Sequence, residues 1–214
     1  MSLARLFSLV APPLCVACGA VASVYQPLCR GCLRDLTWLG SEQPDAGTGI
    51  AVWAAVSYEG AARALVRALK FRGAVGLVDA MAAQMAANAP PGLLEGRSLV
   101  PVPLHRSRRR RRGFNQAEAI ATALARRSGL PVADCLERSG GGARASQVGK
   151  GRDERLDALD GLIRLRAGAT VPLRALLVDD VVTTGATLAA CAAVLAAAGA
   201  REVGAVVYAR TPGR

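Results

Sequence analysis

The pattern of hydrophobic and polar residues predicts alternating strands and helices from residue 50 onward. Short runs of aliphatic, β-branched and aromatic residues, typical of strands, occupy residues 50–58, 99–102, 131–136, 162–165, 175–179 and 203–208. Apolar residues at helical spacing occupy residues 61–71, 75–88, 115–127 and 185–198. Strands that alternate with helices indicate an α/β fold with a mostly parallel sheet flanked by helices.

The N-terminal part of the chain does not follow this alternation. Residues 1–40 predict a short amphipathic helix followed by a small module, and residues 41–49, which are rich in Gly, Pro, Ser and Asp, predict a linker. Residues 50–214 then form one main domain, because a chain of 214 residues can bury one good-sized core. No apolar run is long enough to cross a bilayer, so we expect a cytoplasmic protein with no membrane partner.

Four cysteines near the N-terminus have the spacing of a metal site. The pattern C-x2-C-x10-C-x2-C is formed by Cys15, Cys18, Cys29 and Cys32. Each pair can sit on a tight turn and present two thiolates to one tetrahedral zinc ion. A pair of disulfides is the alternative, but a reducing compartment disfavours it. We therefore predict a structural zinc module.

An acidic and threonine-rich segment, LLVDDVVTTGATL at residues 176–188, predicts a ligand site. The strand is expected to end at Asp179 and Asp180, which places two carboxylates at the carboxyl end of the sheet, where open α/β folds bind ligands. The threonines and glycine that follow lead into an alanine-rich helix, whose first amides lack an acceptor within the helix. Hydroxyls, amides and helix dipole all favour a phosphate.

A second unusual segment, LVPVPLHRSRRRRRGFNQA, begins at residue 99. Its prolines remove backbone donors, so the chain should leave the sheet there and turn near Asp179 and Thr184. His105, the single histidine, is predicted to contact the ligand rather than to act as a base, and a structural hydrogen bond is the alternative.

The chain has a formal net charge of +11, and six arginines within residues 106–112 supply much of it. Polyanions and phosphorylated metabolites are therefore natural partners. A solvated basic loop is one interpretation of the run; contact with pyrophosphate or with nucleic acid is the other. The candidate phosphate or nucleic-acid contacts are Arg108, Arg109, Arg110, Arg111 and Arg112.

These motifs together resemble a known family. LLVDDVVTTGATL is similar to the phosphoribosyl diphosphate (PRPP) motif of type I phosphoribosyltransferases. Its combination with the four-cysteine module, ALKFRG at residues 68–73, and PVPL followed by RGFNQ resembles the ComF (ComFC) family over nearly the whole chain. The resemblance implies a type I phosphoribosyltransferase fold that binds PRPP, or a related sugar phosphate, with magnesium.

The resemblance also implies roles for individual residues. Asp179 and Asp180 would be the catalytic acids, serving the ribose hydroxyls and the magnesium shell. The 5-phosphate would be wrapped by Thr183, Thr184, Gly185, Ala186 and Thr187. The pyrophosphate loop would consist of Val102, Pro103, Leu104 and His105. Lys70 and Arg72 are similar to a basic pair of the family and are placed near the site.

The sequence departs from the family in the predicted flexible loop, RASQVGKGRDERLDAL. Relatives commonly carry Thr-x-x-Gln followed by Arg-x-x-Asn, and here only the Gln and the Arg of these elements match. The loop residues singled out as candidates for closing over the anion are Arg144, Gln147, Lys150, Arg152 and Arg155. The departures leave open whether the protein is an active phosphoribosyltransferase.

Three functions follow from the resemblance. The first is a magnesium-dependent phosphoribosyltransferase with an unknown acceptor. The second is a ComF-like factor linked to DNA uptake or processing in natural transformation, with single-stranded DNA or DNA-processing proteins as partners. In a variant of this second function the protein is a catalytically inactive adaptor that senses PRPP or a nucleotide. The third is a structural zinc-ribbon adaptor that retains a vestigial sugar-phosphate pocket. The absence of any Ser-His-Asp or Cys-His set fits a transfer reaction that needs no covalent nucleophile.

Overall fold

The computed structural model describes residues 13–23, 26–41, 48–72, 75–138 and 163–213. Its centre is a four-stranded parallel sheet with the strand order β1-β6-β5-β2. The four strands are β1 (Val52–Ser57), β2 (Ser98–Pro101), β5 (Arg174–Val182) and β6 (Glu202–Arg210). The predicted α/β fold with a parallel sheet is therefore confirmed.

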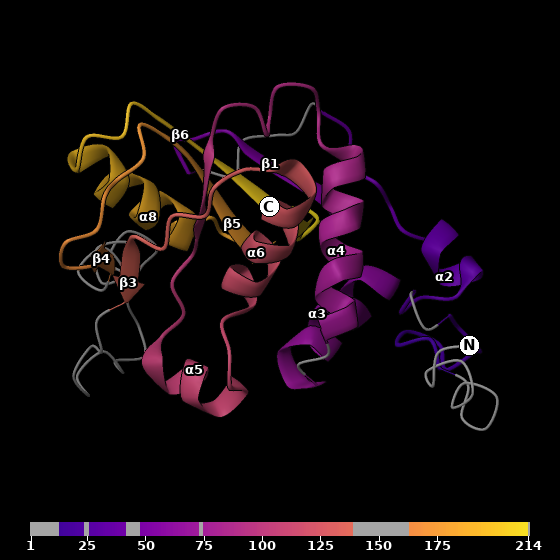
Figure 1. Ribbon diagram of the computed structural model, residues 1–214. Coiled ribbons are helices and arrows are strands. Elements are labelled where there is room, and N and C mark those ends of the chain that lie inside the picture. Colours follow the sequence, from indigo (N-terminus) through magenta and orange to yellow (C-terminus); the bar gives the residue numbers. More distant parts are fainter. Residues whose placement is uncertain (1–12, 24–25, 42–47, 73–74, 139–162, 214) are drawn as a thin grey trace.

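Helices cover both faces of this sheet (Figure 1). One face carries α3 (Gly60–Arg72), α4 (Val75–Asn88) and α6 (Gln116–Ser128). The other face carries α8 (Ala186–Ala197). Alanine and leucine are strong helix formers, and the alanine-rich sequence of α8 lets it lie close to the sheet.

The strands alternate between two hydrophobic clusters, because successive side chains of a strand point to opposite faces. Trp53 belongs to the cluster under α3, α4 and α6, whereas the next residue, Ala54, belongs to the cluster under α8. Met81 and Met85 are fully buried in the first cluster, as their spacing predicts. Both faces of the sheet are thus covered, which is typical of parallel sheets.

The N-terminal module contains the short helix α2 (Arg30–Arg34) and packs on the first cluster through its own buried residues. Leu28 and Leu36 are 3% and 5% exposed within that cluster. Residues 37–39 then run antiparallel along β1: the Leu39 N–H donates to the Ala55 carbonyl, and the Ser57 N–H donates to the Thr37 carbonyl. The predicted helix at the start of the chain lies outside the described residues.

Three sequence predictions about the strands are wrong in detail. Residues 131–136 do not form one strand: Val132 makes an isolated parallel bridge to Leu99, and the strand β3 is Leu136–Arg138. β3 pairs antiparallel with β4 (Ile163–Leu165) in a separate two-stranded sheet rather than in the main one. Short apolar runs do not reveal their pairing partner, which is set by tertiary packing.

The third difference concerns β5, which does not end at the two acids but continues to Val182. β6 keeps pairing with it, with Val181 opposite Ala209. β2, on the other side, stops at Pro101, and the N–H of Val102 donates to the Val178 carbonyl as the last contact before the turn. β5 therefore protrudes past β2 at the carboxyl edge of the sheet.

The arginine run forms a helix, α5 (Arg106–Arg112), for which no helix was predicted. Such a run carries no apolar periodicity, so the pattern that reveals helices is absent from it. Arginine nevertheless has a high helix propensity, His105 caps the start, and Gly113 ends the helix in the left-handed conformation. Among the described helices, none has both the length and the apolar composition to cross a bilayer.

Candidate functional site

The two predicted acids lie where β5 protrudes past β2. Asp180 is only 6% exposed, and its Oδ2 lies 3.1 Å from Nζ of Lys70, which projects from α3. Asp179 is half-buried, and its Oδ1 accepts a hydrogen bond of 2.8 Å from the Asp180 N–H. The fold thus brings Lys70, a residue placed near the site on family resemblance alone, into direct contact with the acid pair.

This crowding of carboxylates changes their acidity. Burial and the neighbouring charge of Asp180 raise the pKa of Asp179 to about 7. Burial also raises the pKa of Asp180, and the cations Lys70 and Arg112 oppose that rise. Two acids held in this state are ready to accept hydrogen bonds from hydroxyls or to bind a cation, since either would relieve their desolvation and mutual repulsion.

The threonine-rich segment after β5 forms the start of α8. Gly185 has a φ of +76°, a left-handed conformation that glycine adopts without strain, and no side chain caps the helix from this position. Thr183 and Thr184 are exposed, and Thr184 Oγ1 lies 3.5 Å from the Ala186 N–H. Threonine hydroxyls and the first amides of α8 therefore meet at one point, which is the physical requirement of a phosphate site.

The predicted turn after β2 lies beside the acids, because Pro101 pairs with Val178, the residue before Asp179. Val102 and Pro103 are buried, and Leu104 and His105 are partly exposed. The His105 Nδ1 accepts from the Ser107 N–H at 3.2 Å and lies 2.7 Å from its hydroxyl, so this side chain caps α5. Its predicted role as a ligand contact stays a prediction.

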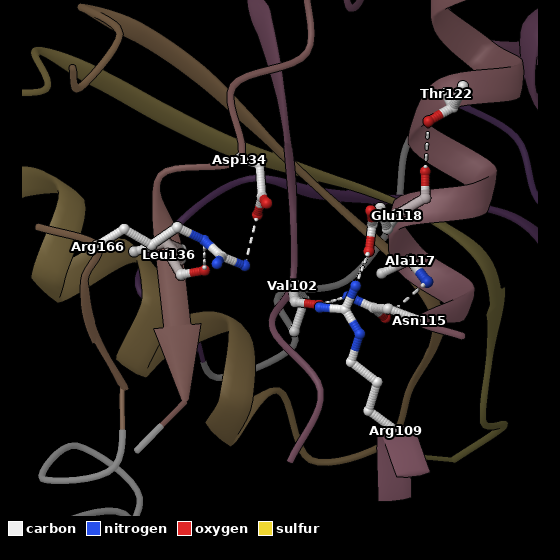
Figure 2. Close-up of polar contacts among 9 residues, drawn as sticks. All are labelled: Val102, Arg109, Asn115, Ala117, Glu118, Thr122, Asp134, Leu136 and Arg166. Atoms are coloured by element: carbon white, nitrogen blue, oxygen red, sulfur yellow. Dashed lines mark hydrogen bonds and ion pairs between the residues drawn. The ribbon is translucent and has the colours of Figure 1, made fainter. Parts of the chain in front are cut away.

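A residue that the sequence analysis did not single out fixes the position of this turn. Asn115 caps α6 by accepting from the Ala117 N–H, and its Nδ2 donates to the Val102 carbonyl at 3.1 Å (Figure 2). The sequence signal was present, since asparagine before an apolar periodic segment is a strong N-cap. Its contact with a residue 13 positions earlier could not be read from that signal.

The arginines of α5 differ in their surroundings. Arg108, Arg110 and Arg111 are exposed, and Arg109 is exposed but lies 3.4 Å from Glu118 of α6 (Figure 2). Arg112 alone among these five is half-buried. The run is therefore a charged helix in which Arg112, among the arginines whose side chains are described, is turned inward, rather than a uniform basic loop.

Several predicted site residues lie outside the described part of the chain. These are the side chain of Arg72 and the flexible-loop residues Arg144, Gln147, Lys150, Arg152 and Arg155. The described segments on either side of that loop are β3 and β4, which pair with each other through Arg138 and Ile163.

The four predicted metal ligands come together in the N-terminal module. The Sγ atoms of Cys15, Cys18, Cys29 and Cys32 all lie within 4.8 Å of one another. The Cys18 and Cys29 sulphurs are 3.7 Å apart, too far for a disulfide bond. Four thiolates at about 2.3 Å around a tetrahedral ion would be roughly 3.8 Å apart. The cluster could therefore hold a metal ion.

Local hydrogen bonds prepare this cluster for deprotonation. Burial alone would raise the pKa of Cys15, but backbone N–H groups of the two turns donate to its sulphur and lower the pKa to about 6. The Cys32 N–H likewise lowers the pKa of Cys29. The pKa of Cys32 is raised by its neighbours, chiefly Cys18, which reflects the cost of packing several thiolates without a cation.

The comparisons with known proteins agree with this geometry. A family model described as "Phosphoribosyl transferase domain" matches residues 72–214. The chain is similar to the competence protein ComFC of Streptococcus pneumoniae, at 38% identity over 104 residues that make up 49% of this chain and 44% of that protein. It is also similar to the competence protein ComFC of Bacillus subtilis, at 26% identity over 182 residues, or 82% of this chain and 68% of that protein.

The matched part thus spans less than half of the first relative's length. The resemblance predicted from the sequence motifs is confirmed by both relatives and by the family model.

Proposed function

Because this chain belongs to the phosphoribosyl transferase domain family, we propose that it binds PRPP with magnesium at the carboxyl end of β5. The observation that carries the proposal is the continuity of the site. The buried Asp180 and the half-buried Asp179 are followed within a few residues by the start of α8. One ligand that has both hydroxyls and a phosphate matches that order, and a phosphorylated ribose is such a ligand.

In this proposal each part of the sugar phosphate has its own partner. The acid pair accepts hydrogen bonds from the ribose hydroxyls, and the amides and hydroxyls of residues 183–187 bind the 5-phosphate. Lys70 holds the Asp180 carboxylate in place by its 3.1 Å ion pair. Magnesium would be held by the acid pair and the substrate, and it would supply charge stabilisation for the departing pyrophosphate.

The proposed activity is transfer of the phosphoribosyl group. When the bond between the anomeric carbon and pyrophosphate breaks, positive charge develops on the ribose and negative charge on the leaving group. The turn at residues 102–105 lies next to the acids and would bind the leaving group through its backbone. No side chain has to form a covalent bond, and the acceptor supplies the electron pair that attacks the carbon.

The same proposal assigns zinc to the four-cysteine cluster and a competence role to the protein. Thiolate ligands at tetrahedral spacing suit zinc, which is then a structural ion that stabilises the module. Both relatives carry the name competence protein ComFC. We therefore assign this chain a function linked to DNA uptake or processing in natural transformation.

A second candidate is an inactive adaptor that binds PRPP or a nucleotide as a signal and contacts single-stranded DNA. The exposed arginines of α5 favour it, because Arg108, Arg110 and Arg111 present three charges to solvent on one short helix. Replacing these three by serine should weaken single-stranded DNA binding and reduce the slope of log K against log salt by about 2. An unchanged slope would count against this contact.

Calorimetry tests the main proposal. Wild-type protein with magnesium should bind PRPP, and Asp180→Asn should bind it much more weakly while keeping its metal content. Pyrophosphate release from PRPP, measured across a panel of bases and amines, then separates the transferase from the adaptor. No heat of binding for PRPP with the wild-type protein would refute both functions at this site.

A further inference from the structure

Arg112 differs from the other arginines of α5 in what it contacts. Its Nη1 donates to the side-chain oxygen of Gln116 at 3.0 Å, and the residue is half-buried, whereas Arg108, Arg110 and Arg111 are exposed. An arginine held in one geometry loses less conformational freedom when it binds an anion than an exposed one does. The structure therefore separates Arg112 from the general basic surface.

Gln116 is an unusual anchor for this contact. It is the first residue of α6 and only 3% exposed, although glutamine is seldom buried. The preceding residue, Asn115, holds the Val102 carbonyl of the turn. Arg112 is thus fixed, through Gln116 and the start of α6, to the same segment that fixes the turn between β2 and α5.

Two hydrogen-bond donors of Arg112 and Gln116 have no acceptor. Within the described part of the chain, neither the Arg112 Nε nor the Gln116 Nε2 has a hydrogen-bond acceptor, although both atoms are buried. A buried donor without an acceptor costs free energy, and such a group needs an explanation. An anion that enters here, with a small rotation of the two side chains, would supply the missing acceptors.

The charge of Arg112 also reaches the acid pair. Burial raises the pKa of Asp180, and the positive charges of Lys70 and Arg112 both oppose that rise. Lys70 is already committed to Asp180 by its ion pair. Arg112 makes no ion pair within the described residues, so its charge remains available to a ligand that lies between the acids and the turn.

We infer that Arg112 binds the pyrophosphate group of the substrate and that Gln116 is its positioning residue. This inference rests on the proposed function, since it names a contact within the same site. The pyrophosphate end is chosen because Arg112 is joined through Gln116 and Asn115 to the turn, whereas the 5-phosphate position at α8 is a separate part of the site.

Two ligands test the binding of the two ends of PRPP independently. Binding of inorganic pyrophosphate and of ribose 5-phosphate, each with magnesium at fixed ionic strength, is measured by calorimetry on the full chain. Arg112→Gln should raise the Kd for pyrophosphate roughly tenfold to a hundredfold, the loss expected for a charge-assisted hydrogen bond. The Kd for ribose 5-phosphate should change by less than about twofold, which also shows that the variant is folded.

Arg127→Gln is the matched control, because it removes the same charge from an exposed position in the last turn of α6, far along the helix from Gln116. It should leave both Kd values within about twofold, since an exposed charge is screened by solvent and salt. Gln116→Leu should weaken pyrophosphate binding and spare ribose 5-phosphate, because the guanidinium loses its acceptor. If Arg112→Gln does not fold, Arg112→Lys keeps the charge, loses the planar fork, and should still bind pyrophosphate several-fold more weakly.

Equal pyrophosphate binding by the wild type and the Arg112 variants would overturn the inference, as would a wild-type protein that binds ribose 5-phosphate but not pyrophosphate. In both cases the proposed sugar-phosphate site would stand. A wild-type protein that binds neither PRPP nor ribose 5-phosphate would instead refute the proposed function, and this inference with it.

Discussion

Replacing Asp179 with asparagine should stabilise the folded protein at neutral and alkaline pH. In the fold, burial and the charge of Asp180 raise the pKa of Asp179 from 3.8 to about 7. Between these two values the folded state binds more protons at this carboxyl than the unfolded state does. The free energy of unfolding therefore falls as pH rises through this window, and the full cost is present above pH 7.

The size of the effect follows from the same pKa difference. A change from 3.8 to about 7 corresponds to about 4 kcal/mol when the carboxylate is fully ionised. Asparagine keeps the shape but accepts the hydrogen bond from the Asp180 N–H less strongly than a carboxylate does. We therefore expect a net gain of about 2 kcal/mol at pH 8, or roughly 4–8 °C in the melting temperature of a chain of this size.

Urea denaturation of wild type and variant at pH 5 and pH 8, without magnesium or ligand, measures this gain. The gain should be larger at pH 8 than at pH 5 by about 2.5 kcal/mol, because the interval from pH 5 to pH 7 covers most of the window in which the cost of the buried carboxylate grows. Asp79→Asn is the matched control: it removes a carboxylate that is 45% exposed and paired with Arg126, and it should change stability by less than about 1 kcal/mol. A gain for Asp179→Asn that is absent, or equal at both pH values, would refute the reasoning.

The remaining predictions concern the ion pair, the metal cluster and the start of α8. Lys70→Met should lower the free energy of unfolding by about 3 kcal/mol at pH 8, because it leaves the Asp180 carboxylate buried and unpaired. In the double variant that also carries Asp180→Asn, most of this loss should be restored, and urea denaturation measures both effects. Cys29→Ser should abolish metal binding by the four-cysteine cluster, as measured by native mass spectrometry, and lower the melting temperature. Gly185→Ala should lower the free energy of unfolding by about 1–2 kcal/mol and weaken PRPP binding, because alanine is strained at a φ of +76°. The control is Gly76→Ala at an exposed position of α4, which should be neutral or stabilising. A Gly185→Ala variant that is as stable as the wild type and binds PRPP normally would contradict this prediction.

Much of the fold could be predicted because its main elements have strong local signals. The helix expected at residues 75–88 has those limits in the structure, and the strand expected at 203–208 is the centre of β6. The positions of the acids, the turn after β2 and the cysteine cluster also followed from sequence. Each depends on a short motif whose chemistry is local, such as prolines that stop a strand or cysteines two residues apart.

The parts that could not be predicted depend on contacts between distant segments. The family resemblance places Lys70 near the site, but its ion pair with Asp180 could not be predicted, since that contact requires the packing of α3 against the sheet. The continuation of β5 to Val182 depends on the length of β6. The inward turn of Arg112 could not be read from a run of identical residues, because only the position of α6 makes it different from Arg111.

Both edge strands of the sheet, β1 and β2, are covered by other segments of the chain, which affects how the protein interacts with other molecules. Residues 37–39 occupy the free side of β1, and residues 131–133 make a similar contact along β2, where the Leu99 N–H donates to the Pro131 carbonyl. Exposed edge strands can pair with strands of other molecules, and in this protein short segments of the same chain cover both edges. The N-terminal module therefore also protects the sheet, whether or not it holds an ion, because residues 37–39 cover the edge of β1. A chain truncated to begin at residue 50 would expose this edge to other molecules and would be prone to aggregate.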